Sequence, residues 1–393
     1  MSEWKKLPLD KMGVISRGKS KHRPRNDARL FGGKYPFIQT GDIGAAGLYV
    51  QNYSQTYNEE GLAQSKLWAK DTLCITIAAN IADTALLAFP ACFPDSIMGF
   101  VPYENISNVK YVKYCFDILK KDCQQISQGT AQDNLSWKKL STILFPCPPI
   151  EFQNRIANIL SRYDSLIENY QKQIKLLEEA AQRLYKEWFV DLYFPGHENT
   201  KIVDGVPEGW EKKSVSQLGD YLNGFAFKPS DWQETGKPII KIKEMGNGVS
   251  DETPRNNGER VPVKYLVKAG DLLFSWSATL MVIVWTGEEG WLNQHLFKVT
   301  PAKGIGREFL LQSISNAIAE FSNLTTGSTM KHIQRNKLDQ VFVNTPSSIV
   351  MEKYNKVAES IRAQILNISS QICLLTEARD RLLPKLMSGE IAV

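Results

Sequence analysis

Residues 150–189 read IEFQNRIANILSRYDSLIENYQKQIKLLEEAAQRLYKEWF, and this stretch decides the fold. Its apolar residues recur in alternating steps of four and three, at Ile156, Leu160, Tyr163, Ile167, Tyr170, Ile174, Leu177, Ala181, Leu184 and Trp188. This spacing is the seam of a heptad repeat, which keeps one narrow apolar stripe on one side of a helix. Pro148-Pro149 and Pro195-Gly196 mark its expected start and end. The predicted helix is about 55–60 Å long, and so long a single stripe needs a partner to cover it.

The partner lies in the same chain. Moving forward by 198 positions carries most of the seam onto a second apolar series, namely Tyr354, Ala358, Ile361, Ile365, Ile368, Ile372, Leu375 and Leu382. Only Ala181, which lands on Arg379, breaks the apolar match. A shared register at a fixed offset predicts a duplicated chain, in which each copy is a domain followed by a long helix.

Landmarks outside the helices support the duplication. Segments that echo each other are 38–43 with 239–245, 70–74 with 270–274, 95–101 with 293–299, and 129–135 with 327–333. We therefore predict an α+β fold with pseudo-two-fold duplication and two strand-rich domains. The expected divisions are a first domain at 1–148, a first helix at 149–195, a second domain at 196–346, and a second helix with a C-terminal tail at 347–393. Two equivalent stripes pair best about a two-fold axis, which makes the helices antiparallel.

Composition and missing motifs favour a binding protein. The 393 residues carry a formal charge of +5, which permits a polyanionic partner without requiring one. Neither GxxxxGK[ST] nor GxGxxG occurs, the six cysteines form no CxxC pair, and the four histidines are isolated. The Asn/Asp-Pro-Pro-aromatic motif of amino-methyltransferases is also missing. The start MSEWKKLPLD has no apolar signal core, and the longest apolar run, 272–285, is too short to span a bilayer. We expect a cytoplasmic protein with no cofactor or metal of its own.

The most basic stretch lies in the first domain and reads SRGKSKHRPR, residues 16–25. A run of charges is usually a solvated surface loop. Guanidinium and ammonium groups between glycine and serine also suit contacts to the phosphates of DNA, which is the interpretation we favour. The candidate residues are Arg17, Lys19, Ser20, Lys21, Arg23 and Arg25. In the second domain, 225–228 occupies the comparable place, with Lys228 as a candidate and with aromatic residues that could equally be core.

Two further groups are candidates for contacts to DNA. The polar loops near 129 and 327 contribute Gly129, Thr130, Gln132, Ser328, Thr329, Lys331 and His332, although each loop could be only a connecting turn. Segments that follow predicted strands contribute Gln39, Thr40, Lys241 and Lys243, with Asp42 and Glu244 beside them. For His295 and His332, a hydrogen-bonded structural role is the more common outcome than catalysis.

The closing stretch ARDRLLPKLMSGEI, residues 378–391, resembles the C-terminal signature of the specificity subunits of Type I restriction-modification systems. The recurring polar loops and the 270–273 segment resemble landmarks of that family's target recognition domains. The resemblance implies two recognition domains, each reading half of a split double-stranded DNA site, and a pair of antiparallel helices as spacer. It also implies partners: two modification subunits that bind S-adenosylmethionine and methylate adenine, and restriction subunits that use ATP and Mg.

The leading hypothesis is therefore a DNA-binding specificity module without catalysis of its own. Two other classes stay open at this point: a DNA methyltransferase or nuclease whose site the motifs do not reveal, and a coiled-coil scaffold whose end domains bind proteins. The base sequence of the target does not follow from any of these residues.

Overall fold

The computed structural model describes residues 4–127, 135–324, 335–391 and 393. The chain divides into two compact units, of which the first is made of two segments of the sequence and the second of one. Unit 1 contains residues 1–171 and 371–393, and unit 2 contains residues 172–370. Each unit thus has one strand-rich domain and a part of each long helix, α5 (Ile150–Tyr185) and α8 (Ser348–Met387). The predicted α+β fold with two strand-rich domains and two long helices is confirmed.

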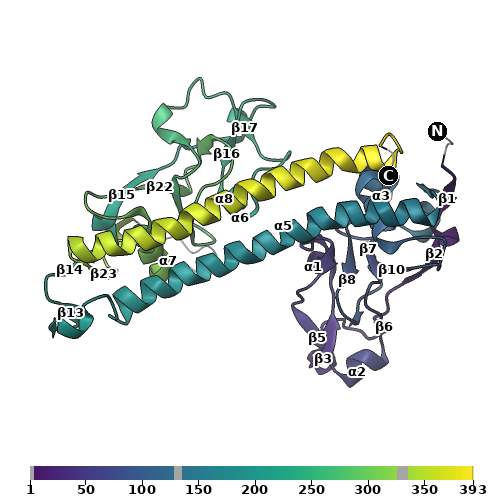
Figure 1. Cartoon of the computed structure of the whole chain (residues 1–393), viewed down its shortest axis with the longest axis horizontal. Helices are drawn as coiled ribbons and strands as arrows, with labels where there is room; N and C mark the ends of the chain where they lie inside the picture. The colour runs from purple at the N-terminus through teal and green to yellow at the C-terminus, as the bar shows by residue number, and fades with distance from the viewer. Residues whose placement is uncertain (1–3, 128–134, 325–334, 392) are drawn as a thin grey trace. The chain divides into compact units, whose positions relative to one another are not determined.

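Unit 1 contains a five-stranded sheet of order β2-β10-β7-β8-β4, a four-stranded sheet of order β5-β3-β9-β6, and the pair β1-β11 (Figure 1). Helix α3 crosses β8, and its buried face joins the core under the larger sheet. The elements are β1 (Lys6–Pro8), β2 (Gly13–Arg17), β3 (Phe31–Phe37), α1 (Thr40–Gly44), β4 (Tyr49–Val50), β5 (Gln55–Tyr57), α2 (Glu59–Ala63), β6 (Leu67–Trp68), β7 (Leu73–Thr76), β8 (Thr84–Leu87), β9 (Ala91–Cys92), β10 (Ile97–Pro102), α3 (Val109–Ser127), α4 (Trp137–Leu140) and β11 (Leu144–Pro146).

Unit 2 repeats this plan with two four-stranded sheets, β15-β22-β19-β20 and β17-β16-β21-β18, and the pairs β14-β23 and β12-β13. Helix α7 packs on β20 and β22, as α3 packs in unit 1. The elements are β12 (Ile202–Val203), β13 (Val206–Pro207), β14 (Glu211–Ser214), β15 (Gly219–Asn223), β16 (Lys237–Ile240), α6 (Ile242–Asn247), β17 (Arg255–Asn256), β18 (Leu266–Val267), β19 (Leu272–Ser275), β20 (Met281–Val284), β21 (Gly290–Leu292), β22 (Leu296–Pro301), α7 (Arg307–Leu324) and β23 (Phe342–Thr345).

Strand register makes the two units comparable residue by residue. Arg17 at the end of β2 pairs with Met98 of β10, and Asn223 at the end of β15 pairs with Phe297 of β22. Asp71 and Gly270 both have positive φ, and each donates its N–H across the hairpin that follows, to the carbonyls of Leu87 and Trp285, so they are equivalent. This places β7 and β10 at an offset of 199 from β19 and β22, whereas Arg17 and Asn223 differ by 206. The predicted alignment of Gly270 with Lys70 is therefore wrong by one residue.

Helix α5 begins after two prolines, as predicted, and its first turn is anchored by a buried amide. Gln153 donates to the carbonyls of Ile106 and Pro148 at 2.9 and 2.8 Å, and accepts from the N–H of Asn108 at 3.0 Å. Because a buried amide stabilises a helix start only when its hydrogen bonds are made, these contacts fix where α5 enters unit 1.

The α-helix ends earlier than the predicted boundary at residue 195. It gives way at Tyr185 to a π-helical turn, Lys186–Val190. Trp188 and Phe189 are neighbours in sequence, and both are buried in the core of unit 2. A π-turn inside a helix changes the direction of successive side chains, and this one coincides with the burial of two adjacent aromatic residues.

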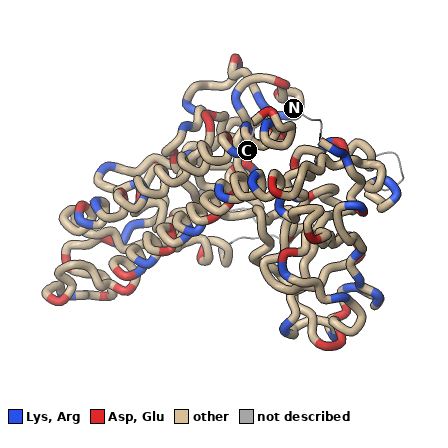
Figure 2. Tube along the Cα trace, turned by 45° about the vertical axis from the view of Figure 1, so that its right-hand side comes forward, with Lys and Arg blue, Asp and Glu red and all other residues tan. Residues whose placement is uncertain are grey.

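The predicted seam of α5 is buried or half-buried at every position, whereas most positions between the seam residues are exposed. Both blue and red segments occur along the long helices in Figure 2. The helices run antiparallel within each unit. In unit 1, Ile156 and Leu160 near the start of α5 share a core with Leu386 and Met387 at the end of α8.

Arg379, which breaks the apolar match between the two seams, has a specific partner in unit 1. Its Nη1 donates to Asp164 at 2.7 Å, and Asp164 also accepts a hydrogen bond from the hydroxyl of Tyr114 on α3. In unit 2 the residue equivalent to Asp164 is Arg362, which pairs with Glu308 of α7 at 3.0 Å. Each unit therefore fastens its α3-type helix to the long helices through a charged contact, with different residues.

Candidate nucleic-acid interface

The basic segment of unit 1 follows β2 and is anchored by its backbone. The N–H of Gly18 donates to Ile97 O at 2.8 Å, and that of Lys19 donates to Phe93 O at 3.1 Å. A Cβ on Gly18 would lie 2.3 Å from the carbonyl oxygen of Pro94, so only glycine fits here. The hydroxyl of Ser65 holds the carbonyl of Lys19 at 2.8 Å. The start of the basic segment is thus a fixed part of the fold.

Three basic side chains of this segment are exposed and have no ion pair or side-chain hydrogen bond within the described part of the chain. They are Arg17, Lys19 and Lys21. Such groups are suited to phosphates, since they give up only water and counterions on binding. Ser20 differs from the expectation, because its side chain is buried and does not present a hydroxyl at the surface.

Arg23 and Arg25 are exposed but engaged within unit 1. Arg25 donates from Nη2 to both carboxylate oxygens of Asp95, at 2.6 and 2.8 Å. Arg23 donates from Nη1 to the carbonyls of Ser20 and His22 at 2.6 and 2.8 Å, and its Nη2 lies 3.8 Å from Asp95. The basic stretch therefore divides into three free cations and two arginines that share one carboxylate.

Further hydrogen bonds stabilise the tip of the same loop. The N–H of His22 donates to Gln64 at 3.0 Å, and its ring lies 2.8 Å from the carboxylate of Asp27. Hydrogen bonds from Arg29 hold the pKa of the Asp27 carboxyl well below its usual range, and the hydrogen bond with His22 adds to this effect. Asp27 is therefore charged at neutral pH, and it serves the loop as an acceptor.

The segments after β3 and β16 share a structural device that the sequence did not reveal. In both, the backbone N–H of the residue that begins a short helix donates to the carboxylate of the residue three positions later. Gln39 N–H donates to Asp42 at 2.7 Å, and Lys241 N–H donates to Glu244 at 3.0 Å. Asp42 and Glu244 are thus capping residues. Glu244 is buried and does not face DNA, whereas a contact of half-buried Asp42 to DNA stays a prediction.

The side chains beside these caps have partners as well. Gln39 donates to Gln55 at 2.6 Å, and Lys243 pairs with Glu252 at 3.0 Å. The ammonium of Lys241 lies 4.3 Å from the ring centre of Trp232, and burial lowers its pKa while Glu244 acts in the opposite direction. A further candidate in this region, Thr40, is half-buried in the first turn of α1.

Unit 2 has the same anchor as the basic segment but different side chains. The N–H of Gly224 donates to Leu296 O at 3.0 Å, and that of Phe225 donates to Leu292 O at 2.9 Å. Gly224 and Phe225 are thus equivalent to Gly18 and Lys19. A Cβ on Gly224 would lie 2.2 Å from Asn293 O, so this glycine is required too.

Aromatic residues take the place of the basic ones in unit 2. The ring of Phe225 lies 4.9 Å from that of Phe227 and 5.7 Å from that of Tyr265. Lys228 is exposed, and its N–H donates to Asp231 at 2.7 Å. The predicted correspondence between 225–228 and the basic segment is confirmed in position, with half-buried aromatic rings and one exposed lysine in place of the free cations.

Sequence reasoning missed several polar residues at this end of the sheets. In unit 1 the omitted residue is Asp95. In unit 2, Trp276 donates to Asn223 at 3.2 Å, and Gln294 lies 3.4 Å from His295, the histidine for which the sequence predicted a structural role. With the offset of 199, Gln294 is the equivalent of Asp95. The predicted offset of 198 aligned Asp95 with Asn293 instead, one residue away from Gln294.

Seven predicted contact residues lie outside the described residues: Gly129, Thr130, Gln132, Ser328, Thr329, Lys331 and His332. The first described residue after the loop near 129 is Leu135, whose N–H donates to Ile77 O at 2.9 Å. Their proposed contacts to DNA stay predictions.

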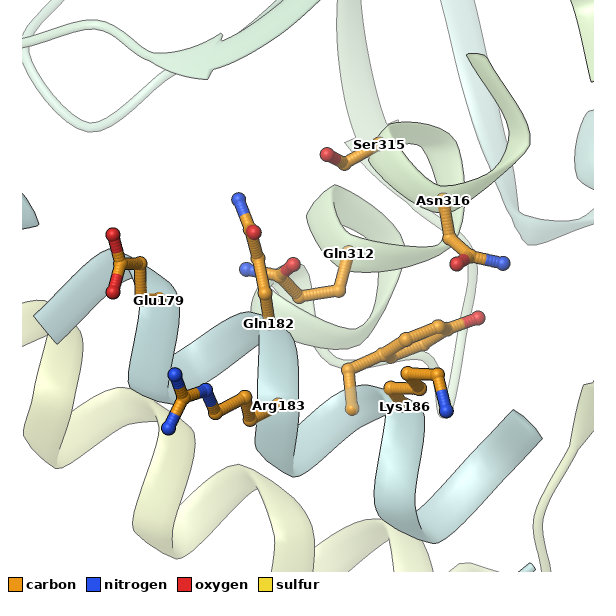
Figure 3. A pocket seen from close by; sticks show the side chains of 8 residues that line it. Glu179, Gln182, Arg183, Lys186, Gln312, Ser315 and Asn316 are labelled. Atoms are coloured by element: carbon orange, nitrogen blue, oxygen red, sulfur yellow. The ribbon is translucent and has the colours of Figure 1, made fainter. Parts of the chain in front are cut away.

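A second kind of surface lies within unit 2, where α5 and α7 border a hollow of about 430 Å³ (Figure 3). Its lining is polar and comes from both helices: Glu179, Gln182, Arg183, Tyr185 and Lys186 of α5 and the turn after it, with Gln312, Ser315 and Asn316 of α7. At an offset of 198, Glu179 and Arg183 correspond to Glu377 and Arg381 of α8, which form an ion pair at 2.5 Å in unit 1.

Two other kinds of site are absent among the described residues. No cluster of three or more His, Cys, Asp or Glu side chains could hold a metal ion. No described helix combines the length and the apolar character that crossing a membrane requires.

Two units with one fold and one loop anchor, but with unlike side chains at equivalent positions, define a duplicated recognition protein. Residues 1–179 and 207–353 match the family described as Type I restriction modification DNA specificity domain. The chain belongs to this family, which confirms the resemblance noted in the sequence.

Relatives and a solved structure agree with this assignment. The specificity subunit of Type I restriction enzyme MjaIX from Methanocaldococcus jannaschii is 24% identical over 418 residues, covering 100% of this chain and 94% of that protein. The HindI specificity subunit from Haemophilus influenzae is 25% identical over 325 residues, covering 65% of this chain and 71% of that one. The S subunit of a Type-I restriction-modification system from M. genitalium shares the fold, with a TM-score of 0.55 at 15% identity over 98% of this chain and 96% of that chain.

Proposed function

We propose that this chain reads an asymmetric, bipartite double-stranded DNA target, with one recognition domain for each half-site. The paired helices set the gap between the half-sites, and the chain performs no catalysis of its own. The observation that carries the proposal is the pair of equivalent anchored segments. Gly18 and Gly224 hold the same place in the two units, yet cations follow the first and aromatic rings follow the second.

The first domain is suited to DNA by its free cations. Replacing Arg17, Lys19 and Lys21 by glutamine removes three candidate phosphate contacts. Because each contact releases counterions, the slope of log K against log salt should fall in magnitude by about 0.9 for each one. The preferred sequence should stay the same, since phosphate contacts position a protein on DNA without specifying bases. An unchanged slope would mean that this loop points away from DNA.

The proposal includes partner subunits. Two modification subunits would bind S-adenosylmethionine and methylate adenine, and restriction subunits would supply chemistry dependent on ATP and Mg. The support is a pair of charged residues that recurs on the long helices. Glu179 and Arg183 of α5 in unit 2, where they line the hollow beside α7, correspond to Glu377 and Arg381 of α8 in unit 1. One partner surface could therefore recognise both units.

Exchange of one domain tests the proposal. Residues 1–148 are replaced by the matching domain of another specificity subunit, the chimera is co-expressed with the modification subunits, and methylated adenines are mapped across a genome. One half of the target should change while the other half and the gap stay the same. Changes in both halves would contradict the assignment of one domain to each half-site.

Two controls separate this proposal from the other classes. The purified chain is incubated with DNA and S-adenosylmethionine, and methyl transfer by the chain alone would show it to be an enzyme. DNA binding by the complex is also measured against salt, since counterion release gives a steep dependence for DNA and a weak one for a protein ligand. A flat salt dependence would favour a protein scaffold.

A further inference from the structure

We propose that Arg25, held by Asp95, reads a guanine in the half-site of the first domain. The free cations Arg17, Lys19 and Lys21 contact phosphates instead. This inference rests on the proposed function, which it deepens by assigning base recognition to one side chain. It departs from the sequence-based expectation that all five basic residues of the stretch act alike.

The geometry leaves Arg25 able to bind a base. Its Nη2 is held by Asp95 at 2.6 and 2.8 Å, while Nη1 and Nε have no partner among the described residues. About half of its side chain, 49%, is exposed. A guanidinium carries five donors in a rigid plane, so donors remain for the two acceptors of guanine, O6 and N7.

The carboxylate of Asp95 argues against a phosphate as the ligand of Arg25. The carboxylate cancels one of the two positive charges of Arg23 and Arg25, so this group releases fewer counterions on meeting DNA than two free cations would. A phosphate beside Arg25 would also lie close to Asp95, and like charges at short range repel. The edge of a base pair carries no net charge and avoids this repulsion. The pair therefore suits a base, whereas unpaired cations suit phosphates.

The loop that carries Arg25 is ordered before any ligand arrives. Arg23 ties its own guanidinium to the backbone at Ser20 and His22, and His22 is held in turn by Gln64 and Asp27. A contact made by a pre-ordered side chain loses less conformational entropy on binding, and a fixed position is what discrimination between bases requires.

The second unit provides an internal contrast. Gln294 stands at the position of Asp95, Asn223 at that of Arg17, and Phe225 at that of Lys19. At these equivalent positions, the second unit has no carboxylate that could hold an arginine as Asp95 holds Arg25. The effect of changing it should be confined to one half-site.

The test uses the full chain in complex with the modification subunits of its system. The wild-type complex and the variants Arg25→Gln, Asp95→Asn and Lys21→Gln each select from a random DNA library, and bound sequences are read. Binding to the wild-type target and to single-base variants is then measured across a series of salt concentrations. All three side chains are exposed, and the unchanged half-site reports in every case that the protein is folded.

Arg25→Gln should relax preference at one G·C pair of the first half-site by about 10- to 100-fold and leave the second half-site intact. Lys21→Gln should weaken all sequences equally and lower the magnitude of the salt slope by about 0.9. Asp95→Asn should free Arg25, which strengthens binding to unrelated DNA and steepens the salt slope.

A uniform loss of affinity with a lower slope in Arg25→Gln, as expected for Lys21→Gln, would overturn the assignment. If the wild-type complex selects no split target, the proposed function itself fails. The wild-type selection thus distinguishes the two failures before any variant is considered.

Discussion

The sharpest test of the paired helices is to lengthen one of them. Inserting four residues after Glu178 adds about 6 Å to α5, because an α-helix rises about 1.5 Å for each residue. At about 3.4 Å per base pair, this corresponds to one or two base pairs of B-DNA. The insertion also turns the helix by about 400°, one turn plus 40°, so the seam between Leu177 and Ala181 must adjust.

We expect the variant to keep both half-sites and to recognise them with a gap longer by one or two base pairs. Inserting seven residues keeps the heptad register and adds about 10 Å, which should lengthen the gap by about three base pairs. A matched control inserts four residues at Asp204-Gly205, the turn of the β12–β13 hairpin, where both residues have positive φ. The control should leave the gap unchanged.

The assay is a map of methylated adenines in cells that carry each variant with the modification subunits. Because the gap is read directly from the methylated sites, activity and spacing are measured together. An active four-residue variant with its original spacing would refute the reasoning. The gap would then be set by contacts outside the helices, and the heptad seam would serve stability alone.

Two further predictions concern the stability of the units and are measured by denaturant unfolding. Gly18→Ala should destabilise the chain by about 2 kcal/mol or more, since its Cβ would meet a backbone oxygen at 2.3 Å, whereas Gly47→Ala, with nothing within 4 Å, should change stability by less than about 0.5 kcal/mol. Arg362→Met should cost about 1–3 kcal/mol because the buried carboxylate of Glu308 then keeps only Arg307 as a partner, while the double variant with Glu308→Leu should recover most of that loss. Equal effects of the two glycine changes, or no recovery in the double variant, would contradict these explanations.

The long helices could be predicted from the sequence because their signal is local and repeated. Every seam position of α5 is buried or half-buried, and the duplication found at an offset of 198 agrees with two units of one plan. The single exception, Arg379, has its explanation in Asp164, a residue 215 positions away. A periodic pattern predicts where a stripe lies, but not which distant charge replaces an apolar residue in it.

The candidate interface was harder to predict because its chemistry depends on pairing across the fold. Five basic residues look alike in sequence, yet the structure leaves three of them free and joins two to Asp95, which comes from a loop 70 residues later than Arg25. The capping roles of Asp42 and Glu244 are equally hidden, since an acidic residue after a strand has the same appearance whether it caps a helix or faces a ligand. Strand register resolves the one-residue error that concealed Asp95 and Gln294 as equivalents.

The first recognition domain packs on helix segments outside its own residue range, which limits the domains that can replace it. The core of unit 1 combines residues of α3 with Ile156 and Leu160 of α5 and with Leu386 of α8, so the domain folds against helix segments that lie outside residues 1–148. Tyr114 also contacts Asp164 directly. A foreign domain will therefore be accepted only if its own α3-type helix presents a matching face to these segments. The parts of the domain free to differ are the loops at the far ends of the strands, where Arg25 and its neighbours lie, while the helix-facing side has to remain nearly constant.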